Sequence, residues 1–454
     1  MYRSMLAALA VTATLLTAAP ASARPAGGTV DFSHHLQSID GFGFSQAFQR
    51  ASLIHGAQGL TPEHQREVLD LLLSPRTGAG LSILRLGIGS STDTVYDHMP
   101  TIEPTDPGGP EATPTYVWDG DDGGQVWLAQ EARAYGVRRF YADAWSAPAF
   151  MKDNGSDTGG GALLPEWRPA YAAYLRQYAA FYAQEGIRVT DLGFTNEPDL
   201  ATSYASMRFT PDQAVAMVKA LGPALHGTGI KIACCDAAGW DQQAPFSAAI
   251  EADPVADHYV ATHTGHPYIS DSDHPLPTDN PVWMSEWSPN GSTWNEAWDD
   301  GSAYDGISVA QQIDRTLTDA GASAYIYWFG ASLGATRGLI QLDGPGYHVS
   351  KRLWALAAYS RFIRPGAVRV AASAADPAVQ VSAFRNRDGS RVIELLNTGT
   401  DAVSSTYAVG GGGHGSVHLT DGTHSVAHVG SAAVRGGRLA VQLPARSLTT
   451  VVLR

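Results

Sequence analysis

The chain has 454 residues, and 44% of them are hydrophobic, which is enough to bury the core of one large domain together with a smaller one. Its formal net charge is −14, which argues against a nucleic-acid partner, because proteins that bind DNA or RNA usually present a basic face. The composition also argues against a disordered chain.

The first 23 residues have the pattern of a secretory signal peptide. Arg3 supplies a positive charge, residues 5–19 form an apolar run, and Ala21-Ser22-Ala23 is a small-residue cleavage site. The run is too short for a spanning helix, which needs ~20 apolar residues, and no later stretch qualifies. We expect cleavage after Ala23 and an exported, soluble, extracellular protein that does not associate with membranes.

Apolar strands alternate with helical patterns over residues 39–366, which predicts a parallel sheet with crossover helices. Most of these strands are short continuous apolar runs, as expected when both faces are covered. Eight such units predict an α/β fold, a closed (β/α)₈ TIM barrel. The predicted strands are Ile39–Ser45, Ile83–Ile88, Arg139–Trp145, Asp191–Asn196, Lys231–Asp236, Tyr259–His263, Val282–Trp287 and Ala324–Phe329.

Three helices between these strands have clear sequence signals. Thr61-Pro62-Glu63 and Thr210-Pro211-Asp212 each combine an N-cap, a proline at the first helical position and an acid in the first turn. A third helix, ended by Gly186, carries a face of aromatic and aliphatic residues at spacings of three and four, which we expect to pack against the sheet. That face consists of Tyr171, Tyr174, Leu175, Tyr178, Phe181 and Tyr182.

The composition changes after Pro365-Gly366, where short strands alternate with turns. Residues 367–454 therefore predict a small antiparallel β-sandwich beside the barrel, and the early stretch Val30–Gln37, within residues 29–38, adds a strand to it. A loop is expected at Gly410–Gly413. The predicted strands are Val368–Val370, Val379–Phe384, Val392–Leu396, Ser416–Leu419, Leu439–Leu443 and Thr449–Leu453.

The two cysteines, Cys234 and Cys235, are adjacent on a predicted strand. Neighbours on a strand point to opposite faces, so we expect two free, buried thiols rather than a vicinal disulfide. No cysteine–histidine spacing resembles a zinc site, and we expect neither a metal nor a cofactor.

Two apolar strands, the fourth and the seventh, end on Glu197 and Glu286. A charged carboxylate is costly to bury without a partner, but the carboxyl ends of barrel strands are where active sites collect. Taken singly, each glutamate could cap a helix or pair with an arginine. Together they match glycoside hydrolysis, in which one carboxyl group protonates the leaving oxygen and the other attacks the sugar or activates water.

Six longer motifs resemble glycoside hydrolase family 30 of clan A, and they look most similar to its subfamily 7, which includes xylanases. The resemblance covers nearly all of the mature chain. It implies a (β/α)₈ barrel with a side β-sandwich built from both chain ends, Glu197 as the acid/base and Glu286 as the nucleophile. The motifs are GFGFSQAFQRA (41–51), SILRLGIGSS (82–91), YADAWSAPAFMK (141–152), GFTNEPDL (193–200), KIACCDAAGW (231–240) and SKRLWALAAYSRFIRPGAVRV (350–370).

Eight further residues are candidates for substrate binding. Asn196 can donate to the sugar 2-hydroxyl, and Arg85 can hold Glu286 ionised, although it could also be a structural arginine. Tryptophans at strand ends offer flat faces for sugars, but they also fill barrel mouths. Polar groups on the strands could bind hydroxyls or be structural. The full set is Arg50, Arg85, Asp143, Trp145, Asn196, His263, Trp287 and Trp328.

One segment departs from the family pattern. Many relatives carry His-x-Tyr after strand six, with the tyrosine near the nucleophile, whereas here His263 is followed two residues later by Gly265. His266 or Tyr268 could take the place of the missing group.

The leading hypothesis is a secreted, retaining, monomeric β-glycosidase acting on xylan, in particular glucuronoxylan. Arg50 follows the first strand, and its guanidinium suits a uronate carboxylate, although it could instead pair with a neighbouring acid. The alternatives are a β-1,6-glucanase, a β-1,6-galactanase or a glucosylceramidase of the same family, a silent carbohydrate-binding protein, and a metallohydrolase using barrel histidines. Endo or exo action does not follow from the sequence.

Overall fold

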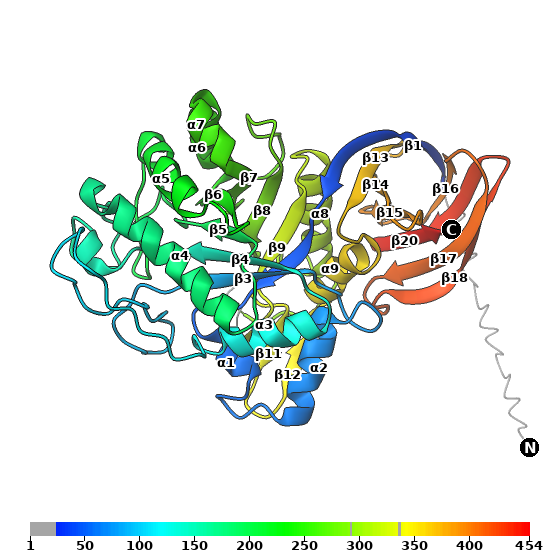
Figure 1. Ribbon diagram of the computed structural model, residues 1–454. Helices are drawn as coiled ribbons and strands as arrows, with labels where there is room; N and C mark the ends of the chain where they lie inside the picture. The colour runs from blue at the N-terminus through cyan, green and yellow to red at the C-terminus, as the bar shows by residue number, and fades with distance from the viewer. Residues whose placement is uncertain (1–23, 291–292, 335–336) are drawn as a thin grey trace, which may run out of the picture.

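The computed structural model describes residues 24–290, 293–334 and 337–454 (Figure 1). The predicted signal segment, residues 1–23, lies outside the described residues. Among the described helices, none combines the length and apolar composition needed to cross a membrane. The chain forms a barrel with a β-sandwich docked at its side (Figure 1).

Eight parallel strands hydrogen-bond in sequence order, and the first also pairs with the last, which closes the barrel. Nearly all their residues are buried, as expected for strands packed on both faces. The predicted (β/α)₈ barrel is confirmed. Its strands are β2 (Gly41–Ser45), β3 (Ile83–Ile88), β4 (Arg139–Ala144), β5 (Asp191–Gly193), β6 (Lys231–Ala237), β7 (Val260–Gly265), β8 (Val282–Trp287) and β9 (Ala324–Phe329).

Helices surround the barrel (Figure 1), and two begin at the predicted caps. The Thr61 hydroxyl accepts from the His64 amide, and Thr210 forms a reciprocal capping box with Gln213. The α-helices are α1 (Arg50–Ile54), α2 (Pro62–Leu73), α3 (Gln125–Ala134), α4 (Arg168–Gln184), α5 (Pro211–Ala224), α6 (Trp240–Ala252), α7 (Pro254–Tyr259), α8 (Gly306–Thr318) and α9 (Lys351–Phe362), with short 3₁₀ turns η1 (Ala149–Met151) and η2 (Pro165–Trp167).

The tyrosine face of α4 packs into the core, as predicted. Tyr171, Tyr174, Tyr178 and Tyr182 are all fully buried, and their hydroxyls have partners inside the protein. Tyr178 and Tyr182, for example, both donate to the Asp122 carboxylate at 2.6 Å. These rings therefore position the helix against the barrel and do not form a sugar-binding surface.

The sandwich is a closed sheet of nine strands around its own apolar core. The N-terminal strand β1 pairs antiparallel with β13 and parallel with β16, so both ends of the chain contribute, as the family resemblance implied. The strands are β1 (Arg24–Ile39), β13 (Ala367–Ala374), β14 (Val379–Arg385), β15 (Arg391–Asn397), β16 (Val403–Ala408), β17 (Gly413–Thr420), β18 (Ala427–Arg435), β19 (Arg438–Leu443) and β20 (Ser447–Leu453).

Several strands were not predicted. In the sandwich these are β16 and β18, which are half-exposed and rich in serine and alanine, so they lack an apolar run. After β9 a separate three-stranded sheet forms from β10 (Ala331–Leu333), β11 (Ile340–Leu342) and β12 (Tyr347–Val349). Three-residue strands are too short to give a period-2 signal.

Helices α8 and α9 lie between the barrel and the sandwich (Figure 1). Polar contacts join the two units here: the Ser382 hydroxyl donates to Asp314 at 2.9 Å, and the Trp298 indole donates to the Arg446 carbonyl at 2.6 Å. The sandwich is thus docked by specific hydrogen bonds as well as by apolar packing.

The prediction for the cysteines was wrong, because Cys234 and Cys235 form a disulfide within β6. The peptide between them is cis, and the pairing of β6 with β7 shifts register on both sides of the two cysteines. The regular alternation of strand side chains, on which the prediction rested, does not hold at this point.

Candidate active site

A cavity of about 420 Å³ opens at the carboxyl ends of the barrel strands. Glu197 and Glu286 both line it, together with Trp145 and Trp328. The two glutamates are only 6% and 5% exposed, so each carboxyl group reaches solvent through the cavity alone. The barrel therefore brings together the two residues that the sequence placed 89 positions apart.

Glu286 lies on β8 and is held by two donors. Its Oε2 accepts a hydrogen bond from Arg85 Nη1, and its Oε1 accepts one from the Tyr268 hydroxyl at 3.0 Å. A cationic donor and a phenol favour the ionised carboxylate and fix its orientation.

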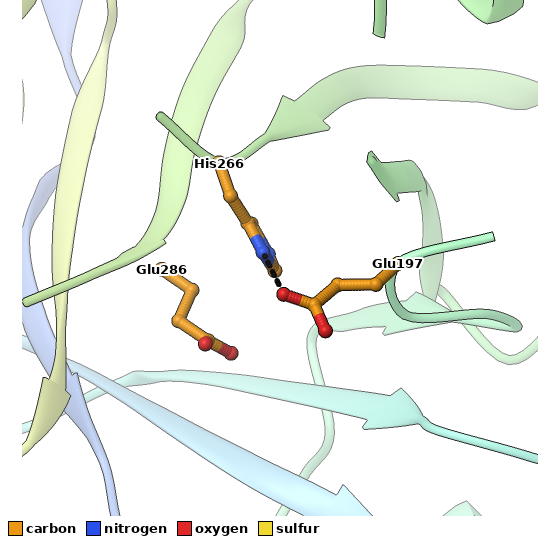
Figure 2. Close-up of side chains that lie close together, drawn as sticks. All are labelled: Glu197, His266 and Glu286. Carbon is orange, nitrogen blue, oxygen red and sulfur yellow. Dashed lines mark ion pairs between the residues drawn. The ribbon is translucent and has the colours of Figure 1, made fainter. Parts of the chain in front are cut away.

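Glu197 follows β5, and its backbone has a positive φ of 48°. Its amide donates to the Asp236 carbonyl at 2.8 Å. The side chain accepts from the Tyr204 hydroxyl through Oε2, while its Oε1 lies 3.5 Å from His266 Nδ1 (Figure 2). The turn after β5 is thus held by backbone and side-chain contacts that aim the carboxyl group into the cavity.

The two carboxyl groups are close. One oxygen of Glu197, one oxygen of Glu286 and a ring nitrogen of His266 all lie within 4.8 Å of one another (Figure 2). In glycosidases a carboxyl separation of ~5–5.5 Å goes with retention, while ~6.5–9.5 Å leaves room for the water of an inverting enzyme. The spacing here favours the retaining arrangement.

Arg85 links several predicted site residues beneath the cavity. It is fully buried, and its Nη2 donates to Asp143 at 2.6 Å and to Asn196 Oδ1 at 2.7 Å. The Asn196 amide nitrogen is buried and has no hydrogen-bond partner among the described residues, and Asn196 does not line the cavity. Asp143 instead belongs to the charge network around Arg85.

Aromatic rings form one wall of the cavity. Trp145 stacks over the Arg85 guanidinium at 4.5 Å, and its ring centroid lies 5.8 Å from that of Trp328. Phe48 packs edge-on against both tryptophans. These faces can receive the apolar side of a sugar ring.

Five predicted binding residues do not line the cavity: Arg85, Asp143 and Asn196, described above, and also His263 and Trp287. His263 is fully buried, and its Nε2 lies 3.6 Å from Glu251 on α6. Trp287 is partly buried against the barrel core, because the residue after the inward-facing Glu286 points outward. The prediction that these two side chains contact substrate does not fit the structure.

Arg50 lines the cavity, but it is already engaged. Its Nη1 pairs with the Asp97 carboxylate and donates to the Phe48 carbonyl at 2.8 Å. A second guanidinium, that of Arg337, also lines the cavity and donates to Asn290 at 2.8 Å. We find no carboxylate paired with Arg337 in the part of the chain that the structure describes.

Two residues of the site, Tyr204 and Asp236, were not predicted from the sequence, whereas His266 and Tyr268 were named as possible replacements and do contact Glu197 and Glu286. The expected His-x-Tyr motif is present, but as His266-Pro267-Tyr268, three residues later than assumed. The reason is that β7 extends to Gly265, beyond the predicted end of that strand.

The electrostatics of the site centre on His266. Burial alone would lower its pKa, but Glu286, Asp236 and Glu197 outweigh that and raise the pKa to about 10. For Glu197 the effects run the other way. Burial would raise its pKa, but the close contact and charge of His266, together with the hydrogen bond from Tyr204, outweigh burial and lower the pKa. The pKa of Glu286 is raised, chiefly by burial. The two carboxyl groups therefore titrate as a pair.

The trio of Glu197, His266 and Glu286 has the spacing of a metal site. With a pKa of about 10, however, His266 is protonated near neutral pH and offers no lone pair to a metal. His263 faces α6 and so does not form a histidine pair with His266. We assign no metal-ligand role to these residues.

Comparison with known proteins agrees with this geometry. Residues 29–274 match the family described as O-Glycosyl hydrolase family 30, and residues 366–451 match the Glycosyl hydrolase family 30 beta sandwich domain. The catalytic domain of GH30 xylanase C from Talaromyces cellulolyticus superimposes with a TM-score of 0.89 at 38% identity, covering 94% of this chain and 100% of that one.

Two curated relatives are more distant. The Glucuronoxylanase XynC of Bacillus subtilis is 26% identical over 72% of this chain and 77% of its own length. The Endo-1,6-beta-D-glucanase neg1 of Aspergillus fumigatus is 23% identical over 81% of this chain and 80% of its own. Similar chains thus include enzymes named for different sugar linkages.

Proposed function

Because the chain belongs to glycosyl hydrolase family 30 and is an O-glycosyl hydrolase, we propose that it cleaves the β-1,4-xylosidic bonds of xylan with retention of configuration. In this proposal Glu197 is the acid/base and Glu286 the nucleophile. The observation that carries it is the pair of buried carboxyl groups at the barrel mouth, with one oxygen of Glu197 within 4.8 Å of one oxygen of Glu286.

The reaction proceeds in two steps. Glu197 gives a proton to the glycosidic oxygen while a Glu286 oxygen attacks the anomeric carbon, so the glycosidic bond breaks and a sugar ester forms on Glu286. Glu197 then takes a proton from water, the water oxygen attacks the same carbon, and the ester bond breaks. Arg85 and Tyr268, which donate to Glu286, keep it oriented for the first attack.

Xylan is the proposed polymer because two proteins similar to this chain are named as xylanases, the Talaromyces xylanase C and the Bacillus glucuronoxylanase. The positive charges in the cavity support a xylan that carries uronate groups. The chain as a whole is acidic, but two guanidinium groups, those of Arg50 and Arg337, line the cavity. A carboxylate on the substrate can form paired hydrogen bonds with such a group.

The alternative is a β-1,6-glucanase, which the similarity to the Aspergillus enzyme favours. The catalytic steps would be the same, and only the shape of the cavity would select the linkage. We further propose that the protein is exported and acts as a monomer, in line with the signal pattern of residues 1–23.

A panel of polymers tests the proposal. We expect the purified protein to release xylo-oligosaccharides from glucuronoxylan and arabinoxylan, and little from β-1,6-glucan, β-1,6-galactan or glucosylceramide. NMR of the first products should show the β-anomer, and product lengths will distinguish endo from exo action.

Glu286→Gln is the matched control, because the amide cannot form the sugar ester, and it should abolish turnover of every substrate. Release of sugar from β-1,6-glucan alone would favour the alternative. Near-normal activity of Glu286→Gln would overturn the catalytic assignment.

A further inference from the structure

A row of three buried groups runs from β6 to the cavity. The Asp236 carboxylate on β6 lies 3.2 Å from His266 Nε2. The other ring nitrogen, Nδ1, lies 3.5 Å from Glu197 Oε1 (Figure 2). Asp236 and His266 are fully buried. Glu197 is the only one of the three that lines the cavity.

Asp236 is held as a carboxylate by donors from three other strands. Thr264 on β7 donates to its Oδ2 at 3.0 Å, Tyr141 on β4 also donates to Oδ2, and Ser285 on β8 donates to Oδ1. A carboxylate that accepts several hydrogen bonds stays ionised even when buried. Burial raises its pKa, but His266, Arg85 and Ser285 outweigh that and bring the pKa to about 2.

Other charged groups surround this row. Arg85 lies 3.7 Å from Asp236, and Asp143 interacts electrostatically with both Asp236 and His266. Glu286 and Asp199 also act on His266. The Nε2 atom of His266 is hydrogen-bonded to Asp236 at 3.2 Å, whereas Nδ1 forms a longer ion pair with Glu197 and has no hydrogen-bond partner among the described residues.

The acid/base role of Glu197 poses a problem that this row can solve. A general acid must carry a proton, yet the pKa of Glu197 in the empty cavity is lowered and that of His266 is raised to about 10. Near neutral pH the proton therefore resides on His266, next to the carboxylate that has to deliver it.

We propose that Asp236 is a positioning residue for the catalytic acid: it holds His266 as a proton store that supplies Glu197. The inference rests on the proposed role of Glu197 and does not depend on which sugar is cleaved. Asp236 also fixes the tautomer of neutral His266, because the proton on Nε2 stays hydrogen-bonded to the Asp236 carboxylate. Nδ1 is then the atom that exchanges a proton with Glu197, as in enzymes where an aspartate lies behind a catalytic histidine.

The proton balance is as follows. The Nδ1–H bond of His266 breaks as an O–H bond forms on Glu197, and that O–H bond breaks as the proton passes to the glycosidic oxygen. His266 is then neutral, with its remaining proton on Nε2 facing Asp236. In the second step water gives a proton to Glu197, which returns it to Nδ1, and the starting state is restored.

Asp236→Asn tests the proposal through the pH profile. An opposite charge within ~4–6 Å typically moves a pKa by 1–3 units, so its removal should lower the proton affinity of His266. We expect the alkaline limb of kcat/KM to move at least about one pH unit toward acid. Thr264→Val is the matched control, because it removes a hydrogen-bond donor to Asp236 but keeps the negative charge of Asp236. The alkaline limb of the Thr264→Val profile should therefore stay at the wild-type pH.

A merely structural role for Asp236 would lower the rate at every pH and leave the limb unmoved, which would overturn the proposal. An alkaline shift of the limb would overturn it as well.

A second measurement covers the case in which Asp236→Asn does not fold. In the wild-type protein labelled with ¹⁵N-histidine, the His266 signals, identified by their loss in His266→Gln, should show both ring nitrogens protonated at pH 7. A neutral His266 at pH 7 would overturn the proposal. This readout needs no substrate, so it is independent of the polymer panel that tests the proposed function.

Discussion

Glu197 and Glu286 carry the same chemical group in different surroundings. Glu286 is bound by the Arg85 guanidinium and by Tyr268, which fix it as an attacking group. Glu197 is bound by a neutral phenol, Tyr204, and faces the ionisable ring of His266. A group that must gain and lose a proton in each cycle benefits from a neighbour that can exchange one.

At the residue scale, Glu197→Gln should separate substrates by their leaving group. Xylan needs protonation of its leaving oxygen, so we expect its kcat/KM to fall by ~10²–10⁴-fold. A dinitrophenyl xyloside leaves without a proton and should lose far less in the first step. Steady-state kinetics on the two substrates measures the difference.

Tyr204→Phe is the control for this variant, because it removes a hydrogen bond to Glu197 and keeps the carboxyl group. Its losses should be small and similar on both substrates. Equal losses on xylan and on the dinitrophenyl xyloside in Glu197→Gln would argue that Glu197 is not the acid.

The two glutamates were predictable because each lies at or just after the end of an apolar run in the sequence, which is an unusual place for a lone charge. Asp236 also ends an apolar strand, but it has no partner in the local sequence. Its donors Tyr141, Thr264 and Ser285 come from three other strands. A network of this kind exists only once the barrel has closed, so the sequence carries no local signal for it.

At the element scale, the loops after the first and last barrel strands each place a guanidinium in the cavity. Arg50 begins α1 and pairs with Asp97, while Arg337, between β10 and β11, donates to the neutral Asn290 and lies over the Tyr268 ring. A substrate carboxylate has to compete with Asp97 for Arg50 but meets no such competitor at Arg337 among the described residues. We therefore regard Arg337 as the more available of the two.

Arg337→Ala should cut activity on glucuronoxylan by roughly ten- to a hundredfold relative to arabinoxylan, since a charge-assisted hydrogen bond contributes ~1.5–3 kcal/mol. Arg50→Ala should reduce the same ratio by less. The measurement is kcat/KM on the two polymers for each variant. Equal losses on both polymers would mean that the arginines are structural, and the uronate preference would be dropped.

Barrel and sandwich strands differed in how well the sequence predicted them. Those of the barrel, such as β3 and β8, are buried on both faces and appear as continuous apolar runs. The sandwich strand β18 has only two buried residues and a mostly polar or small-residue sequence. The signal for a strand therefore weakens with exposure, and that is where the prediction failed.

At the scale of the whole molecule, the joint between barrel and sandwich contains buried acids. Asp314 on α8 accepts from Ser382 on β14, and Glu394 on β15 accepts from Thr450 at 2.6 Å. Burial raises the pKa of Asp314 to about 6, and burial also raises that of Glu394. Both groups are therefore easier to bury in their protonated forms.

This predicts how stability changes with pH. The folded-state pKa of Asp314, about 6, lies above the unfolded value of 3.8. As the pH rises between these two values, the stabilisation that protonated Asp314 gives the folded protein is lost, which lowers the free energy of unfolding by roughly 2–3 kcal/mol. Asp314→Asn keeps an acceptor for Ser382 and has no charge to bury. We expect the free energy of unfolding of the variant, relative to wild type, to increase between pH 4 and pH 7.

Urea denaturation at several pH values measures this difference. Ser382→Ala serves as the control, because it removes the hydrogen bond and keeps the titrating acid. A stability difference between Asp314→Asn and wild type that does not change with pH would contradict a raised pKa for Asp314.

The N-terminal strand β1 has a consequence for the order of folding. Gly28 pairs with Ala374 and Arg24 with Val403, so the sandwich cannot close until nearly the whole chain has emerged from the ribosome. The barrel strands pair in sequence order except for the closing pair of β2 with β9, whereas both partners of β1 lie near the other end of the polypeptide, at very high sequence separation. The pairing of β1 with β13 and β16 thus ties residues that precede the barrel in the sequence to strands that follow it.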